Sequence, residues 1–318
     1  MLKRAFILFA AVALTVVFFA GCGAITVNNV RINEDNITPF DAVSVTTTFS
    51  KIEFVESDRY GLDIYVPESL DPEWGVTDGR LTIIEDTNGL AFNWGVNLDK
   101  GYVKVYYPSG TVFTDITLNS SGGEIELPRA NVADLNITSS SGGINASAEG
   151  NNYAAIESSS GDITFSDNGG KVNIKSSSGK VRAETNNCGA VDVTTSSGGV
   201  TLTGKGDAAT RLSVNTQSGR IDASGVSWRD VTTRSTSGRT TISGELLGET
   251  SVETSSGAVQ ISVDGSLSQY GYNLRPGSGS IYLNGERMTK PALSSGAPGN
   301  NISVVTSSGG IRIDFSGK

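Results

Sequence analysis

The chain has 318 residues, of which 39 are Gly and only 18% are charged, and its formal net charge is −9 at pH 7. It contains no His, which excludes Ser-His-Asp and Cys-His catalysis and every His-ligated metal site. The acidic charge argues against nucleic acid as a partner. The two cysteines, Cys22 and Cys188, form neither a disulfide framework nor a Cys-only zinc site, so no metal or cofactor is expected.

Residues 1–21 have the features of a secretion signal. A basic start precedes an uncharged apolar run from Ala5 to Ala20, which is shorter than the ~20 residues of a membrane span. Phe19-Ala20-Gly21-Cys22 resembles the bacterial lipoprotein box. The resemblance implies cleavage before Cys22 and acylation of its thiol, so an exported lipoprotein anchored to an envelope membrane is predicted. An uncleaved anchor and an ordinary signal with an incidental Cys are the alternatives.

Residues 22–112 are predicted to form an N-terminal β cap. Alternating stretches such as Val43 to Phe49 and Leu62 to Val66 are separated by Gly, Asp and Pro, a pattern typical of strands and turns. A solenoid needs such a cap to cover the hydrophobic end of its first coil.

Residues 113–318 are dominated by a Ser-Ser-Gly-x-Ile/Val repeat. Its anchor glycines are Gly123, Gly142, Gly161, Gly179, Gly198, Gly219, Gly238, Gly257, Gly279 and Gly309. A short and nearly constant period is the signature of a solenoid, in which each coil buries its apolar face only against its neighbours. The sequence therefore predicts an all-β fold, a single β-solenoid of about ten coils.

Each coil is predicted to carry two strands that flank the Ser-Ser-Gly corner. Apolar residues recur seven and five residues before the anchor Gly, and two and four residues after it, as in Leu135/Ile137 and Ile144/Ala146 around Gly142. A spacing of two is the periodicity of a strand, so these pairs are expected to point inward.

The corners are rich in hydroxyl side chains and Gly. A Ser or Thr stands three residues before every anchor Gly except Gly279, and is expected to bond to the turn backbone. The anchor Gly is expected to supply a backbone φ that other residues resist. Further glycines are interpreted as marking the next corner: Gly204, Gly225, Gly244 and Gly285.

The C-terminal end is predicted to be less protected. Residues 284–301, rich in Pro, Gly and Ser, are interpreted as a loop insertion before the last coil. Ile311 to Phe315 is expected to close the chain as an edge strand that carries charges.

Several segments resemble the bacterial putative adhesin family, a domain of unknown function. The resemblance is carried by Ser139-Ser140-Ser141-Gly142-Gly143-Ile144, by the equivalent corners around Gly161 and Gly179, and by Asp78-Gly79-Arg80-Leu81-Thr82-Ile83. It implies an envelope-associated β-solenoid. Family members include proteins linked to envelope-stress operons, so a regulator that binds a membrane protein is one alternative function.

A carbohydrate-active β-helix enzyme is the second alternative. Such an enzyme needs clustered carboxylates, but the positions one residue after the anchor glycines never place two acids on adjacent coils. We therefore expect no enzyme activity. The predicted function is an adhesion or interaction scaffold of the envelope, with an envelope glycan or another envelope protein as its partner.

A basic stretch from Lys171 to Arg239 provides a candidate anion-binding patch on this acidic chain. Its members are Lys180, Arg182, Arg220, Arg234 and Arg239. An ordinary solvated face with compensating acids is the alternative interpretation. Cys188 is interpreted as a partly buried loop residue rather than a reactive thiol.

Overall fold

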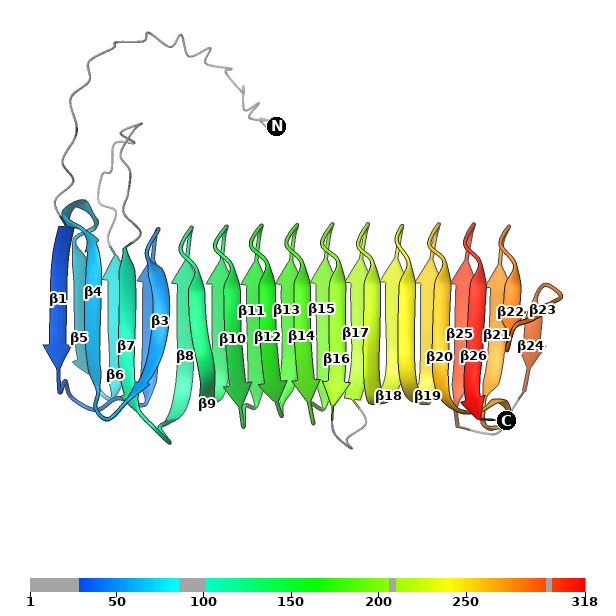
Figure 1. Ribbon diagram of the computed structural model, residues 1–318, viewed down its shortest axis with the longest axis horizontal. Helices are drawn as coiled ribbons and strands as arrows, with labels where there is room; N and C mark the ends of the chain where they lie inside the picture. Colours follow the sequence, from blue (N-terminus) through cyan, green and yellow to red (C-terminus); the bar gives the residue numbers. More distant parts are fainter. Residues whose placement is uncertain (1–28, 86–100, 206–209, 296–298, 318) are drawn as a thin grey trace, which may run out of the picture.

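The computed structural model describes residues 29–85, 101–205, 210–295 and 299–317. These residues form a long rod whose strands run across the rod axis (Figure 1). The prediction of an all-β solenoid is confirmed. Residues 1–21 and Cys22 lie outside the described residues. Within the described ranges, no helix has the length and apolar character that crossing a bilayer requires.

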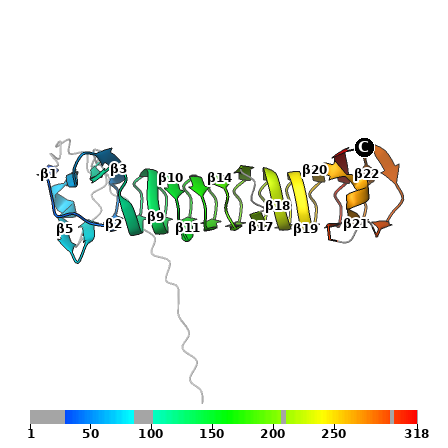
Figure 2. The same cartoon turned by 90° about the horizontal axis from the view of Figure 1, so that it is seen from below.

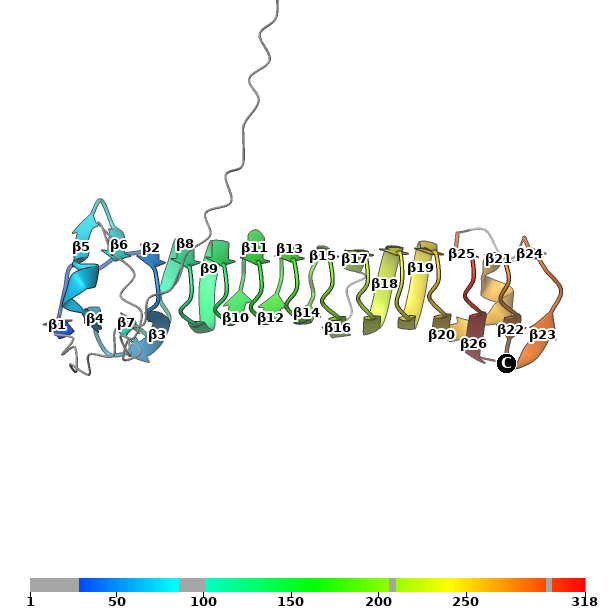
Figure 3. The ribbon, with the colours of Figure 1, turned by 90° about the horizontal axis from the view of Figure 1, so that it is seen from above.

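The rod consists of two facing layers of parallel strands, visible from below in Figure 2 and from above in Figure 3. The strands that precede the corners form the layer that we call the leading sheet, and the strands that follow the corners form the trailing sheet. Strands β9 (Ile125–Ser139), β18 (Ile221–Ser235) and β19 (Thr240–Thr254) are long and contribute their first halves to the trailing sheet and their second halves to the leading sheet.

The other strands of the leading sheet are, in spatial order, β6 (Arg80–Glu85), β2 (Ala42–Thr47), β8 (Val112–Ser120), β11 (Tyr153–Ser158), β13 (Lys171–Ser176), β15 (Ala190–Thr195), β17 (Thr210–Thr216), β25 (Asn301–Thr306) and β21 (Gly271–Pro276). Those of the trailing sheet are β7 (Tyr102–Pro108), β3 (Lys51–Ser57), β10 (Ile144–Glu149), β12 (Ile163–Asn168), β14 (Val181–Asn186), β16 (Val200–Lys205), β20 (Val259–Ser266), β26 (Ile311–Gly317) and β22 (Ile281–Leu283).

Antiparallel strands lie at both ends of the rod. The N-terminal end has β1 (Asn29–Asp35), β4 (Gly61–Pro67), the 3₁₀ turn η1 (Glu68–Leu70) and β5 (Pro72–Thr77). The C-terminal end has the 3₁₀ turn η2 (Leu267–Gln269), β23 (Glu286–Met288) and β24 (Ala292–Ser294). The described part of residues 284–301, predicted as a loop, thus contains two short strands and the first residue of β25. They form because the outer edges of β21 and β22 offer unpaired backbone groups.

The interior is a stack of the predicted inward pairs. Every one of these residues is buried except Tyr272, which is half-buried. Neighbouring coils place β-branched side chains in register, as in Ile137, Ile156 and Ile174 of the leading sheet. Burial of each such side chain contributes about 1.5–3 kcal/mol relative to exposure, so the stack is the main source of stability.

The coils at the C-terminal end do not follow the order of the sequence. β25 pairs with β19 on one side and with β21 on the other, and β26 likewise lies between β20 and β22. Figure 1 shows these last strands of the chain, in red, inserted before the orange ones. The expectation that Ile311 to Phe315 forms an edge strand is wrong, because parallel partners lie on both sides of β26.

A similar exchange occurs at the N-terminal end. β2 and β3 pair with β8 and β9 on one side, and with β6 and β7 on the other. The coil made from residues 42–57 therefore lies between the coil of β8 and β9 and the coil of β6 and β7, although β6 and β7 come later in the sequence than β2 and β3. Parallel ladders are continuous from the predicted cap region into the repeat.

The corners are joined by a ladder of backbone hydrogen bonds. Ser140 N–H donates to the Ser120 carbonyl at 3.0 Å, and Ser159 N–H donates to the Ser139 carbonyl at 3.0 Å. The hydroxyl three residues before the anchor Gly is buried and bonds to the corner backbone, as predicted. Ser120, Ser139, Ser158 and Ser176 donate to the anchor carbonyl, whereas Thr195, Thr216, Thr254 and Thr306 accept from the anchor N–H.

The anchor positions require Gly for a reason other than the predicted one. Among these glycines only Gly238 has a φ in the left-handed region, at 133°. At each of the ten, however, an added β-carbon would lie well under 3.0 Å from a backbone carbonyl of the neighbouring coil. Close approach of adjacent corners, rather than backbone conformation, selects Gly here.

A buried carboxylate closes the corner ladder at the N-terminal end. On one side of the corner of residues 48–50, the Thr48 carbonyl accepts from the Gly122 N–H at 2.7 Å, and on the other side the Glu85 carboxylate accepts from the Thr48 N–H at 2.9 Å. Burial raises the pKa of Glu85. At the opposite end the Lys290 ammonium donates to the Ser278 carbonyl at 3.2 Å.

Two of the further glycines, Gly204 and Gly225, make room for an indole. β18 and β19 pass from the trailing to the leading sheet without a break in the strand, and the register between them shifts beside Gly225 and Gly244, where the next corner was predicted. A β-carbon on Gly225 would lie 2.6 Å from the ring of Trp228, and one on Gly204 would lie 3.0 Å from it. Trp228 is 1% exposed and its indole N–H donates to the Ser243 carbonyl at 3.1 Å. Gly285 lies in the tight turn between β22 and β23.

Candidate functional site

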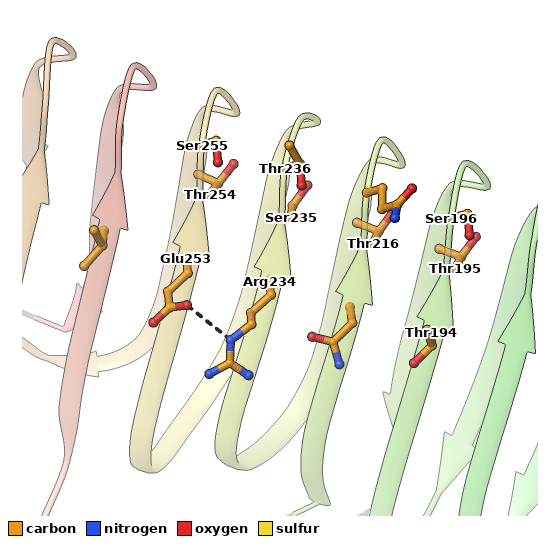
Figure 4. A pocket seen from close by; sticks show the side chains of 13 residues that line it. Thr194, Thr195, Ser196, Thr216, Arg234, Ser235, Thr236, Glu253, Thr254 and Ser255 are labelled. Atoms are coloured by element: carbon orange, nitrogen blue, oxygen red, sulfur yellow. Dashed lines mark hydrogen bonds and ion pairs between the residues drawn. The ribbon is translucent and has the colours of Figure 1, made fainter. Parts of the chain in front are cut away.

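The candidate site is a surface groove of about 430 Å³ on the leading sheet, just below the corners (Figure 4). It crosses β15, β17, β18 and β19 and reaches Val305 on β25. Each of the four coils contributes three consecutive residues: Thr194–Thr195–Ser196, Asn215–Thr216–Gln217, Arg234–Ser235–Thr236 and Glu253–Thr254–Ser255. We call this feature the hydroxyl groove.

The local fold determines which of these side chains a ligand can reach. Thr195, Thr216 and Thr254 face inward and accept hydrogen bonds from their anchor glycines, so their oxygens are already engaged. The residues on either side of each point outward because strand side chains alternate. The accessible surface therefore presents hydroxyl, amide and charged groups at the spacing of the coils, about 4.8 Å.

One ion pair crosses the hydroxyl groove. Arg234 Nε lies 3.2 Å from Glu253 Oε2, with 59% and 54% of the two side chains exposed. An ion pair this exposed contributes no more than about 1 kcal/mol to stability, so both groups are available to exchange partners with a ligand. Because the two charges cancel, the groove carries no net charge.

The structure does not bring the five residues of the predicted anion-binding patch together. Lys180, Arg182, Arg220 and Arg239 lie on or next to trailing-sheet strands, whereas Arg234 lies on the leading sheet in the hydroxyl groove. Arg220 is also paired, with its Nε 2.6 Å from Asp222 Oδ2. These residues are exposed, but they are divided between two faces of the rod.

A second polar cluster is buried between the sheets, and the sequence analysis did not find it. Asp167 is 1% exposed, and its carboxylate accepts from Asn151 Nδ2 at 3.1 Å and from the Asn168 N–H at 2.8 Å. The Cys188 thiol, fully buried, donates to Asp167 Oδ2 at 3.6 Å. Asp167 lies at an inward-facing strand position. The equivalent positions on the two neighbouring strands hold Ala148 and Thr185, so aligning the repeats would show a charged residue at an inward position.

Burial makes Cys188 an unreactive thiol. Burial, together with the nearby Asp167 carboxylate, raises the pKa of Cys188 to about 12, so the thiolate that would react is absent at neutral pH. Cys188 is more deeply buried than the partly buried loop residue that the sequence suggested.

Replacing Asp167 by Asn is expected to remove a pH dependence from stability. Burial raises the pKa of Asp167 from 3.8 to about 6, so the folded state disfavours the charged form. Stability from this group is present below about pH 4 and is lost as the pH rises to about 6. A shift of about two units corresponds to about 3 kcal/mol, so Asp167→Asn is expected to raise the free energy of unfolding at pH 7.5 by about 1–3 kcal/mol.

Urea unfolding of both proteins between pH 4 and 8 measures this effect. Asp192→Asn is the control, because Asp192 is an exposed carboxylate on the outer face of β15. Equal pH slopes in the wild type and Asp167→Asn would contradict the prediction.

A match to a protein family agrees with this architecture. The sequence family Toastrack DUF4097 matches residues 33–221 and 170–314. A search of curated proteins found no match. Among solved structures, a putative lipid binding protein from Parabacteroides distasonis ATCC 8503 is 16% identical with a TM-score of 0.47, and 92% of this chain and 98% of that chain are covered.

Two further structures are of putative adhesins. The one from Parabacteroides distasonis ATCC 8503 is 10% identical, with 91% of this chain and 98% of that chain covered and a TM-score of 0.37. The one from Parabacteroides merdae ATCC 43184 is 12% identical, with 92% and 97% covered and a TM-score of 0.33. Because the family match extends over most of the rod, from residue 33 to residue 314, the chain belongs to the Toastrack DUF4097 family.

Proposed function

We propose that the protein is a non-enzymatic scaffold of the cell envelope that binds an extended glycan chain along the hydroxyl groove. The observation that carries this proposal is the repetition of Thr194, Asn215, Arg234 and Glu253 at equivalent positions of four adjacent coils. An extended polymer contacts such a row at many points, and many weak contacts add to useful affinity when the ligand spans them together.

The chemistry of the groove favours a neutral glycan. Hydroxyl and amide side chains both donate and accept hydrogen bonds, which matches the hydroxyl groups of sugars. The net charge of zero gives no preference for an anionic or cationic polymer. The exposed side chain of Val305 adds a small apolar contact at one end.

The groove geometry supports binding rather than hydrolysis. Hydrolysis of a glycosidic bond needs two carboxyl groups on either side of the scissile bond. Among the residues that line the groove, Glu253 is the one carboxylate, and it is paired with Arg234.

The envelope location in this proposal rests on the N-terminal sequence. The basic start, the apolar run and Cys22 support export and lipid attachment. Two or three acyl chains on Cys22 would hold the rod at a membrane surface.

The test is binding of the full chain to an array of neutral and charged cell-surface glycans, followed by calorimetry with each glycan that is retained. Asn215→Leu removes an amide at the centre of the groove, and we expect it to lower the affinity about tenfold, the effect of losing one or two hydrogen bonds. Release of reducing ends from a bound glycan would contradict a non-enzymatic role.

Asn119→Leu is the matched control. Asn119 occupies the same position relative to its corner as Asn215, is also half-buried, and lies outside the groove. Its replacement is expected to leave glycan binding unchanged. Equal losses in the two variants, or no glycan retained by the wild type, would overturn the proposal.

A further inference from the structure

The trailing sheet has a shallow hollow of about 240 Å³ near the C-terminal end of the rod. Its rim includes Arg239, Gln260, Tyr282 and Arg312. Its floor is formed by small residues, Ala258, Gly310 and Ser280, that follow the anchor glycines of three adjacent coils. This face is opposite the sheet that carries the hydroxyl groove, so a ligand bound here is independent of the glycan proposed for that groove.

The exchange of coils at the C-terminal end assembles this hollow. Arg312 is directly paired in register with Gln260 on one side and with Tyr282 on the other. If the coils were stacked in sequence order, β22 rather than β26 would lie beside β20, and Arg312 would not be paired with Gln260. The insertion of β26 between β20 and β22 therefore places a guanidinium between an amide and a tyrosine ring.

Two arginines, Arg239 and Arg312, line the hollow. Arg239 is exposed and has no ion pair with any other residue of the described ranges. Arg312 is held by Asp314, with Nε and Oδ2 2.6 Å apart, which orients its remaining N–H groups without occupying them. The residues that line the hollow include both arginines and no carboxylate. The charges of Arg312 and Asp314 cancel, so Arg239 makes the local charge positive although the whole chain carries −9.

The positions of the two arginines suit a single anionic group between them. They are two coils apart, about 10 Å along the rod at the usual strand spacing, and both side chains are long enough to reach inward over the small residues of the floor. Guanidinium groups bind carboxylate in a bidentate manner, and such charge-assisted hydrogen bonds are the strong ones.

Tyr282 adds a second recognition element. Its side chain is a large exposed apolar group, with 39% of its surface accessible. Binding sites for small ligands combine an apolar or aromatic surface with a few placed polar groups. The hollow is smaller than the ~300–1,000 Å³ of most small-molecule sites, which limits it to about one sugar ring.

We propose that this hollow binds one carboxylated sugar unit of an acidic glycan, with the carboxylate held by Arg239 and Arg312 and the sugar ring against Tyr282. Gln260, beside Arg312, is placed to bond a ring hydroxyl. The remainder of the glycan would continue over the exposed surface of the rod.

Calorimetry of the full chain with tetragalacturonate and with a hyaluronan tetrasaccharide tests this proposal. We expect binding to at least one of them, and Arg239→Gln is expected to weaken it about tenfold, as the loss of a charge-assisted hydrogen bond implies. Binding should also weaken as salt is raised, because the site is exposed. Absence of binding to both acidic probes would overturn the proposal.

Arg220→Gln is the matched control. Arg220 occupies the same position after its anchor glycine as Arg239, one coil away, but it is paired with Asp222 and lies outside the hollow. Its replacement is expected to leave affinity unchanged. An equal loss in both variants would show that the general charge of the face attracts the probe, and would contradict a defined site.

Two other probes separate a sugar site from a simple anion site. A neutral galactan tetrasaccharide is expected to bind at least tenfold more weakly than tetragalacturonate. Tyr282→Ala is expected to weaken tetragalacturonate binding and to leave any binding of inorganic phosphate unchanged. If phosphate competes fully with the acidic probe and Tyr282→Ala has no effect on either, the sugar assignment is wrong.

Discussion

Replacement of Gly198 by Ala is expected to destabilise the rod by about 4 kcal/mol or more, among the largest effects of a single methyl group in this chain. A β-carbon at this position would lie well under 3.0 Å from the carbonyl oxygen of Gly179, and 3.1 Å from the hydroxyl oxygen of Thr195. Neither backbone can retreat, because hydrogen bonds and packed side chains hold each coil between its two neighbours. The measurement is urea unfolding followed by circular dichroism.

Gly199→Ala provides a control one residue away. The nearest atom to a β-carbon at Gly199 is the Arg220 carbonyl oxygen at 3.8 Å, an ordinary contact. This variant is expected to change stability by no more than about 0.5 kcal/mol, as for other surface substitutions. Similar unfolding midpoints for the two variants would contradict the argument that close approach selects Gly at the corner.

Replacement of Trp228 by Ala is expected to destabilise the chain by about 3–5 kcal/mol. Trp228 is the largest of the fully buried side chains, and it fills a slot between β16, β18 and β19. Removal of the indole leaves a cavity. It also leaves the Ser243 carbonyl without its hydrogen-bond donor. Both effects lower the free energy of unfolding, which calorimetry or urea titration would measure.

A double-mutant cycle with Gly225 tests whether the glycines exist to admit the indole. Gly225→Ala alone is expected to be strongly destabilising, because its β-carbon would lie 2.6 Å from the Trp228 ring. In the Trp228→Ala background the same change should be almost neutral, which gives a coupling energy of about 1–3 kcal/mol. Additive effects would show that Gly225 is required for another reason.

The strands and the core could be predicted from the sequence because each coil repeats the same local pattern. Pairs such as Leu135/Ile137 have the period of two that defines a strand with one buried face. The hydroxyl before each anchor Gly also has a local role, since its hydrogen bond closes within one corner. Such features depend on residues close together in the chain.

The order of the coils could not be predicted in the same way. Every coil presents the same motif to its neighbours, so the sequence does not state whether Gly257 stacks on Gly279 or on Gly309. In the structure Gly257 stacks on Gly309, and this order of the coils places Arg312 beside Gln260. The prediction that Arg234 and Arg239 belong to one patch was wrong for a related reason. The corner at Gly238 lies between them, so Arg234 is on the leading sheet and Arg239 is at the start of the trailing sheet.

The internal position of the last coil affects how the rod opens. In a solenoid whose coils follow the sequence, the terminal coil has one neighbour and separates first. Here residues 301–317 have a coil on each side, so separating them from the rod must break strand pairing on both sides. The outermost coil, β21 with β22, is tethered at both its ends by continuing chain. Residues 301–317 are therefore expected to resist local unfolding as the coils in the middle of the rod do.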